Sequence, residues 1–178
     1  MKAYFDIDTQ IDFLFPSGAL YSPGAERLIA PVARLNALAV KRGIPLISTM
    51  CAHPENAEEF KVWPPHCVAG TAGQRKPAST LQSNGQIFLE KNALDMFSNP
   101  RAAALLDELN IDDCYVYGAF TEYCVRCAVL GLLQRGRKVT LVRDATAAVN
   151  SGAGRNALEE FQSTGGTGYE VCQSSQLE

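Results

Sequence analysis

The chain has 178 residues, of which 47% are hydrophobic and 20% are charged, so it has the size and composition of one globular domain with a substantial core. Its formal net charge of −3 provides no broad basic field, which argues against nucleic acid and anionic membrane surfaces as partners. No segment approaches the roughly 20 apolar residues of a membrane span, and the N-terminus does not resemble a signal peptide, so a cytoplasmic location is expected. The six cysteines are scattered through a chain large enough to fold without disulfides, and we interpret them as thiols or ligands.

Short apolar runs alternate with helical patterns along the chain. The predicted strands are rich in β-branched and aromatic residues; they are Lys2–Asp8, Pro45–Thr49, Gln86–Glu90, Asp113–Gly118, Lys138–Arg143 and Tyr169–Cys172. The predicted helices show apolar residues at helical spacing; they are Ala25–Arg42, Pro100–Leu109, Tyr123–Arg135 and Gly154–Phe161. The alternation predicts one α/β domain over residues 1–178, with a six-stranded parallel sheet and helices on both faces in a Rossmann-like three-layer arrangement.

The segment from Cys51 to Gly85 interrupts this alternation. It is long, it contains Pro54, Pro64, Pro65 and Pro77, and it carries both histidines of the protein. A loop of this length inside a compact domain is usually functional. Because parallel sheets bind ligands at the carboxyl ends of their strands, we expect the functional residues to gather at that edge.

Three reactive side chains lie at the ends of different predicted strands. Cys124 lies where a turn after the fourth strand leads into a helix, and the positive end of that helix is expected to lower the pKa of the thiol and to hold an oxyanion. Asp8 ends the first strand and is placed to accept the thiol proton. Lys91 follows the third strand, where its charge would stabilise both a carboxylate and a thiolate.

Each of these residues also has a purely structural interpretation. A free cysteine such as Cys124 is often a small buried apolar residue. Asp8 could cap the following turn, for which Asp12 is an equally good candidate, and Lys91 could be a solvated surface lysine. The catalytic hypothesis rests on the coincidence that three separate strands each bring one reactive side chain to the same edge.

Four separated motifs resemble the isochorismatase-like cysteine hydrolases. They are Asp8-x-Gln10-x-Asp12-Phe13, Trp63-Pro64-Pro65-His66-Cys67-Val68-x-Gly70-Thr71, Glu90-Lys91 and Gly118-x-x-Thr121-Glu122-Tyr123-Cys124-Val125. Their order and spacing fit from the first strand to the last helix, so the resemblance covers nearly the whole chain. Any one of them alone would be weak evidence, whereas four together are a strong signal.

The resemblance implies an Asp/Lys/Cys triad formed by Asp8, Lys91 and Cys124. It also implies a cis peptide between Ala119 and Phe120, with the N–H groups of Phe120 and Cys124 forming an oxyanion hole. Relatives are often dimers or tetramers, which implies a homo-oligomer.

The stretch from Trp63 to Cys67 is similar to the one typical of nicotinamidases, in which a metal ion binds the pyridine nitrogen of the substrate. By this resemblance, Phe13, Trp63 and Tyr123 would contact an aromatic substrate ring.

At the metal-ligand positions that the nicotinamidase resemblance implies, only some of the residues match the typical pattern. They correspond to Cys51, His53, Glu59 and His66, of which the two histidines match the pattern and the other two residues depart from it. All four are chemically competent zinc ligands, and a thiolate favours zinc over manganese or magnesium. The prediction is therefore a divalent metal, zinc in the first place, against the alternative that the residues only pack the loop.

The function predicted from these motifs is hydrolysis of a small carboxamide through a thioester, with nicotinamide as the first choice of substrate. One alternative keeps the machinery and changes the substrate to another small amide, a ureido compound or an isochorismate-like enol ether. A second alternative is a non-catalytic zinc-binding or thiol-redox domain on the same fold, although the Cys124-x-x-Cys127 spacing alone is weak evidence for dithiol chemistry. Two residues depart from the family pattern: Asp6 replaces an apolar strand residue, and Phe120 is bulky beside the expected cis bond.

Overall fold

A six-stranded parallel sheet forms the centre of the protein, which the computed structural model describes over residues 1–177. The strands are β1 (Lys2–Ile7), β2 (Leu46–Cys51), β3 (Gln86–Lys91), β4 (Asp113–Ala119), β5 (Lys138–Ala147) and β6 (Tyr169–Cys172). Their order across the sheet is β3-β2-β1-β4-β5-β6, and every neighbouring pair is parallel. The predicted single-domain α/β fold is thus confirmed, although its predicted last residue, 178, lies outside the described part of the chain.

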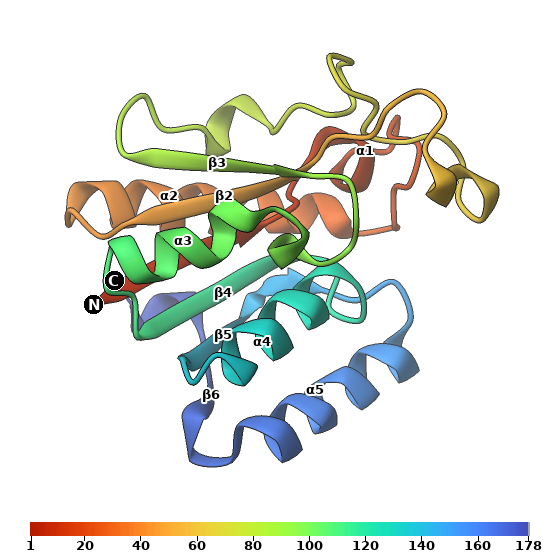
Figure 1. Ribbon diagram of the computed structural model, residues 1–178. Coiled ribbons are helices and arrows are strands. Elements are labelled where there is room, and N and C mark those ends of the chain that lie inside the picture. The colour runs from red at the N-terminus through yellow and green to blue at the C-terminus, as the bar shows by residue number, and fades with distance from the viewer. Residues whose placement is uncertain (178) are drawn as a thin grey trace.

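Helices cover both faces of this sheet (Figure 1). They are α1 (Ile11–Leu14), α2 (Ile29–Lys41), α3 (Pro100–Glu108), α4 (Cys124–Gln134) and α5 (Ser151–Gly165). Helix α2 lies behind the sheet in Figure 1, and α3, α4 and α5 lie in front of it. Among residues 1–177, no helix is both long and apolar enough to cross a membrane.

Two helices begin differently from their prediction. The predicted helix Ala25–Arg42 starts as a 3-10 turn, η1 (Ala25–Leu28), before it continues as α2. Helix α5 begins three residues before its predicted start at Gly154, because the side chain of Asn150 accepts hydrogen bonds from the N–H groups of Gly152 and Ala153. This is a regular N-cap, and the prediction overlooked it by beginning at the first apolar repeat.

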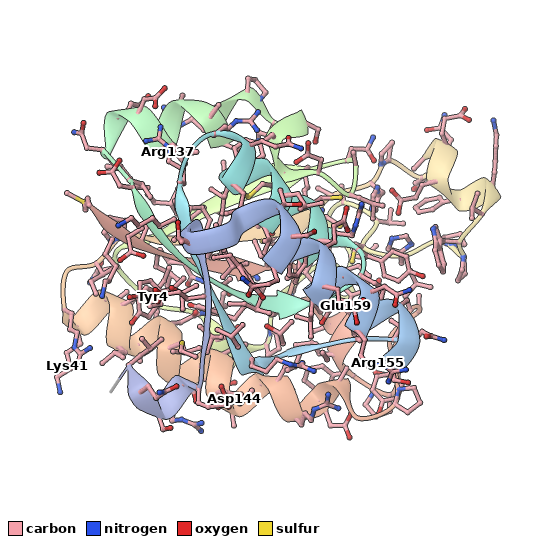
Figure 2. All side chains as sticks on the ribbon, turned by 90° about the horizontal axis from the view of Figure 1, so that it is seen from below. Tyr4, Lys41, Arg137, Asp144, Arg155 and Glu159 are labelled. Carbon is pink, nitrogen blue, oxygen red and sulfur yellow. The ribbon has the colours of Figure 1, made fainter. Side chains whose placement is uncertain are left out.

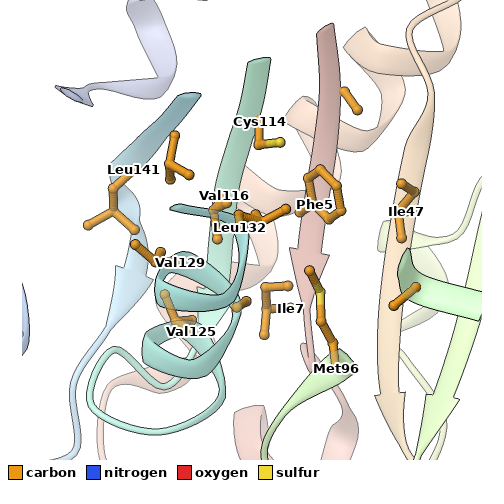
Figure 3. Close-up of a cluster of buried hydrophobic side chains, with 14 of the residues drawn as sticks. Phe5, Ile7, Ile47, Met96, Cys114, Val116, Val125, Val129, Leu132 and Leu141 are labelled. Atoms are coloured by element: carbon orange, nitrogen blue, oxygen red, sulfur yellow. The ribbon is translucent and has the colours of Figure 1, made fainter. Parts of the chain in front are cut away.

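The hydrophobic core forms two layers, one on each face of the sheet. On one face, Phe5, Ile7 and Val116 of the sheet pack against Val125, Val129 and Leu132 of α4, as Figure 3 shows. On the other face, Leu28, Val32 and Leu35 are buried against the sheet. Charged side chains such as Lys41 of α2, and Arg155 and Glu159 of α5, are exposed on the outer sides of the helices (Figure 2).

The strand order determines where a ligand site can form. Connections from β1 and β4 leave the middle of the sheet toward opposite faces, which opens a crevice beyond the carboxyl ends of these two strands. Gly118 allows the strands to approach closely there, since a Cβ on it would lie 2.1 Å from the carbonyl oxygen of Ile7. Asp8 follows β1, and the segment from Phe120 to Cys124 follows β4.

Asp6, for which the sequence offered no explanation, is the centre of a buried polar network. Its carboxylate accepts hydrogen bonds from Thr9 at 2.6 Å, Asn36 at 3.0 Å and Ser48 at 3.1 Å. It also forms an ion pair of 3.1 Å with Lys76, whose side chain is fully buried. Because Lys76 belongs to the long loop after β2, this network fastens the loop to β1 and satisfies a charge that would otherwise be very costly to bury.

Candidate active site

Strand ends bring Asp8, Lys91 and Cys124 to one corner of the crevice. Asp8 is the first residue after β1, Lys91 is the last residue of β3, and Cys124 is the first residue of α4. All three are buried, with 0%, 4% and 6% of their surface exposed. The interpretation of Lys91 as a solvated surface lysine is therefore wrong.

The Lys91 ammonium group connects the members of this cluster. Its Nζ lies 2.7 Å from Asp8 Oδ2 and 3.6 Å from Cys124 Sγ, and it donates a 2.8 Å hydrogen bond to the carbonyl oxygen of Ala93. The other carboxylate oxygen, Asp8 Oδ1, accepts a 2.6 Å hydrogen bond from the Thr49 hydroxyl. A carboxylate oxygen of Asp8 and the Cys124 sulfur lie within 4.8 Å of each other. The carboxylate, the ammonium and the thiol are thus held together around one point.

Burial and charge pairing oppose each other in the Asp8–Lys91 pair. Burial raises the pKa of Asp8, but the Lys91 charge and the hydrogen bonds from Cys124, Lys91 and Thr49 outweigh it, so that this pKa is below its ordinary value. Burial likewise lowers the pKa of Lys91, but Asp8 and the sulfurs of Cys124 and Cys51 raise it well above its ordinary value. Both groups are therefore charged at neutral pH.

The sequence-based expectation of a lowered thiol pKa at Cys124 is wrong. A hydrogen bond with Cys51 and burial raise the pKa of Cys124 well above its ordinary value, and the nearby Lys91 charge only partly opposes them. The helix N-terminus is present as predicted, but a buried thiol beside a second sulfur and a carboxylate is stabilised in its neutral form. The resting state is consequently a thiol, with an ionised carboxylate next to it.

The structure divides the four residues that were predicted to bind a metal. Cys51 ends β2 directly opposite Lys91 in the sheet register, and Lys91 Nζ donates to its sulfur at 3.2 Å. The Cys51 thiol also donates to Asp8 Oδ2 at 3.7 Å. Cys51 therefore belongs to the Asp8–Cys124 group, and the candidate ligand group formed by the other three residues does not include it.

His53, Glu59 and His66 form that second group. Each offers one ligand atom, and these atoms lie within 4.8 Å of one another. Glu59 Oε1 is 3.1 Å from His66 Nε2 and 3.7 Å from His53 Nε2. The Nδ1 atoms point away from the group, to Asn92 Oδ1 at 2.6 Å for His53 and to the Pro64 carbonyl oxygen at 2.9 Å for His66.

These outer contacts determine what the group can bind. When Nδ1 of a histidine donates to an oxygen, its Nε2 carries the lone pair, which is the usual arrangement of a histidine metal ligand. Nε2 of His53 is buried and has no hydrogen-bond partner among the described residues. The neighbouring His66 imidazole lowers the pKa of Glu59 despite the partial burial of this carboxylate. Two imidazole nitrogens and one carboxylate are a suitable donor set for a divalent cation such as zinc.

An aromatic pocket of about 180 Å³ lies between the two groups. Phe13, Trp63 and Tyr123, the three predicted substrate contacts, all line it. The rings of Trp63 and Tyr123 meet edge to face with centroids 5.6 Å apart. Cys51, Cys124, Glu59 and His66 line the same space, so that the Cys124 thiol and two members of the histidine group face one pocket.

The backbone before Cys124 has the conformation that the resemblance implied. The peptide between Ala119 and Phe120 is cis, and the side chain of Phe120 lines the pocket, as expected from its bulk. The Phe120 carbonyl oxygen accepts from the N–H of Tyr123 at 3.0 Å, which closes a tight turn into α4. Cys124 opens the helix, where first-turn N–H groups lack an intrahelical partner.

Several residues of the site were not identified from the sequence. The side-chain amide of Gln10 accepts a 2.7 Å hydrogen bond from the Cys51 N–H and donates one of 2.8 Å to the Cys51 carbonyl oxygen. Thr49 could have been found by strand alternation, because it precedes Cys51 by two residues on β2 and so faces the same side. Three further residues of the pocket wall, Tyr21, Leu94 and Val149, come from loops without any periodic pattern.

The chain is similar in sequence and in fold to known proteins. The isochorismatase domain family matches residues 2–173. The nicotinamidase of Escherichia coli (strain K12) is 27% identical over 96% of this chain and 95% of its own. The crystal structure of a pyrazinamidase of Pyrococcus horikoshii in complex with zinc has a TM-score of 0.89 and 30% identity, and it covers 97% of this chain and 98% of its own. In fold alone, an N-carbamoylsarcosine amidase from Thermoplasma acidophilum is similar as well, with a TM-score of 0.85 and 24% identity over 97% of this chain and 96% of its own.

Proposed function

The chain belongs to the isochorismatase family, and we propose that it is a cysteine amidohydrolase that converts nicotinamide to nicotinate and ammonia. The observation that carries this proposal is the buried cluster at the wall of the aromatic pocket, in which Lys91 Nζ lies 2.7 Å from Asp8 and 3.6 Å from the Cys124 sulfur. These are the three groups that thiol-dependent amide hydrolysis needs: a base, a cation and a nucleophile.

In the proposed mechanism, Asp8 accepts the proton of Cys124 while the sulfur attacks the amide carbon. Because the resting thiol is neutral, proton transfer accompanies the attack, and Lys91 stabilises the negative charge that moves between carboxylate and sulfur. The carbonyl oxygen becomes an oxyanion held by the N–H groups of Phe120 and Cys124. Asp8 then returns the proton to the amide nitrogen, the C–N bond breaks, and ammonia leaves a thioester on Cys124.

Water completes the reaction in a second cycle of the same groups. Asp8 takes a proton from the water as its oxygen attacks the thioester carbon. The C–S bond then breaks, the proton passes to the Cys124 sulfur, and the carboxylic acid is released. Every proton is taken up and returned by Asp8, which fits a carboxylate that is charged in the resting state.

The pocket favours a small, neutral and aromatic substrate. Its volume of about 180 Å³ is below the roughly 300–1,000 Å³ of drug-sized ligand sites. Within the described residues, its wall includes Glu59 but neither an arginine nor a lysine, so no side chain of the wall offers a positive charge to the carboxylate of a ureido acid. The aromatic side chains of Phe13, Trp63 and Phe120 suit a flat ring. The E. coli nicotinamidase and the P. horikoshii pyrazinamidase support the same choice.

His53, Glu59 and His66 would hold a divalent metal, zinc in the first place. When bound, such an ion supplies a Lewis-acid partner for the ring nitrogen of the substrate. The residues of the chain fit this role because Nε2 of His53 has no hydrogen-bond partner among the described residues, and Glu59 and His66, whose ligand atoms lie within 4.8 Å of it, line the pocket. The zinc in the P. horikoshii structure supports the assignment.

Ammonia release from nicotinamide, pyrazinamide and several ureido acids tests the proposal. The protein should be purified without chelators, its metal content measured, and each amide assayed under identical conditions. We expect turnover of nicotinamide and pyrazinamide and little turnover of the ureido acids. Turnover of a ureido acid with none of nicotinamide would shift the substrate class within the family, and a protein without amidase activity would leave the zinc-binding or thiol-redox alternative.

A further inference from the structure

A second thiol lies beside the proposed nucleophile, and the mechanism above does not use it. The sulfurs of Cys51 and Cys124 and a carboxylate oxygen of Asp8 are all within 4.8 Å of one another. Both sulfurs are also within reach of one ammonium group, at 3.2 Å and 3.6 Å from Lys91 Nζ. Cys51 is 3% exposed, and two hydrogen bonds between the Gln10 side chain and the Cys51 backbone fix its position.

Both cysteines face the same pocket, so that a molecule which reaches one sulfur also reaches the other. Small neutral oxidants such as hydroperoxides fit a cavity of this size. Sulfur reacts with a peroxide as the thiolate, and here Asp8 is placed to take the Cys124 proton during the attack, as in the proposed hydrolysis, while the Lys91 charge stabilises the sulfur. The two sulfurs lie within 4.8 Å of each other, and a disulfide bond requires them to approach to roughly 2.0 Å.

We propose that Cys51 is a resolving thiol, which converts an oxidised Cys124 into a reversible Cys51–Cys124 disulfide. Asp8 takes the Cys124 proton as the sulfur attacks a hydroperoxide; the O–O bond breaks, the hydroxyl stays on the sulfur, which is oxidised to a sulfenic acid, and the remaining oxygen leaves as an alcohol or water with the proton from Asp8. The Cys51 sulfur then attacks the sulfenic sulfur; the S–S bond forms, and the hydroxyl leaves as water with the Cys51 proton. A dithiol reductant restores both thiols by exchange.

The physical consequence is protection of the nucleophile. Without a nearby thiol, a sulfenic acid that meets more peroxide proceeds to sulfinic acid, which thiol reductants do not reverse. With Cys51 in place, the amidase is switched off while the oxidant is present and recovers afterwards. The inference rests on the proposed function only in taking Cys124 as the nucleophile, and its chemical product can be detected without any turnover.

Other cysteines are less suitable partners. Cys127 lies one turn further along α4 and is only half-buried, and it does not line the pocket. Cys67 is fully buried, and neither the pocket wall nor the group around Lys91 includes it. These two residues therefore serve as controls.

Peptide mapping after peroxide treatment tests the proposal. The full-length protein is reduced, desalted, exposed to small molar excesses of hydrogen peroxide, and alkylated before digestion and mass spectrometry. We expect the wild type to lose two hydrogen atoms and to give a linked peptide pair containing Cys51 and Cys124, with thiols and ammonia release both recovered after dithiothreitol. The Cys51→Ser variant should instead gain two oxygen atoms on Cys124 and should not recover, whereas Cys127→Ser should behave like the wild type.

Two results would overturn the resolving role. One is oxygen addition to Cys124 in the wild type without a linked pair, and the other is a linked pair that contains Cys127 and persists in Cys51→Ser. If Cys51→Ser does not fold by circular dichroism, the identity of the linked peptides in the wild type still decides the question. If the wild type forms the linked pair but hydrolyses no amide, the proposed function fails and the disulfide chemistry stands.

Discussion

Two buried aspartate–lysine pairs lie side by side at the end of β1, and they have opposite surroundings. Asp6 pairs with Lys76 at 3.1 Å, and Thr9, Asn36 and Ser48 occupy the remaining positions around its carboxylate. Asp8 pairs with Lys91 at 2.7 Å and accepts from Thr49, but its remaining neighbours are two sulfurs at the wall of a pocket. The first pair is surrounded by hydrogen-bonding side chains, whereas the second faces groups that can exchange protons.

This difference teaches how one strand supports both stability and chemistry. A fully hydrogen-bonded buried ion pair fixes the loop that carries His53, Glu59 and His66, and removing one partner leaves an uncompensated charge. A buried pair beside a thiol has the same charges, but its carboxylate has an adjacent proton to accept. Burial and charge are therefore shared features, and the neighbouring donors distinguish a structural pair from a reactive one.

The largest expected effect is that of Cys124→Ala. Removing the nucleophile should lower kcat/KM for nicotinamide by at least ~10⁴-fold, as in other triad hydrolases, while the unfolding free energy changes little because a small buried side chain replaces another. Ammonia release measures the first quantity and urea denaturation the second. Cys127→Ala is the matched control and should retain activity; an equal loss in both variants would show that the helix, rather than the nucleophile, had been damaged.

Lys76→Met should have its main effect on stability. It leaves Asp6 buried without its cation, and we expect a loss of about 3–5 kcal/mol in the free energy of unfolding, measured by urea denaturation. Lys41→Met, which changes an exposed lysine of α2, should stay within about 0.5 kcal/mol of the wild type. A loss below about 1 kcal/mol for Lys76→Met would contradict the role of the Asp6 network.

The pH dependence of stability should be weaker in Asp8→Asn. The pKa of Asp8 is below its ordinary value of 3.8 in the folded protein, so its charge stabilises the fold above that value, and this contribution is lost as the pH falls toward the folded-state pKa. The wild type should therefore lose more unfolding free energy than Asp8→Asn between about pH 5 and pH 3. Denaturation curves at several pH values measure both; parallel profiles would refute the charge pairing of Asp8.

The sequence predicted the sheet and its helices because their residue patterns lie within single segments. It predicted the meeting of Asp8, Lys91 and Cys124 because the carboxyl ends of parallel strands lie at the same edge of a sheet. It did not predict that Cys51 belongs to the Asp8–Cys124 group rather than to the metal-ligand group, since this depends on the sheet register that places Cys51 opposite Lys91. The direction of the Cys124 pKa was also wrong, because burial and the neighbouring sulfur outweigh the helix end.

The role of Asp6 could not be predicted because its partners, from Thr9 to Lys76, lie far apart in the chain. The cytoplasmic location and the homo-oligomer stay predictions.

The central claim, that the Asp8 pair is catalytic and the Asp6 pair is structural, is tested most directly by comparing two lysine variants. Ammonia release from nicotinamide is measured for Lys91→Met and Lys76→Met at a temperature where circular dichroism shows both to be folded. We predict that kcat/KM falls on the order of 10³-fold in Lys91→Met and stays within a few-fold of the wild type in Lys76→Met. Equal losses in the two variants, or full activity of Lys91→Met, would contradict the account.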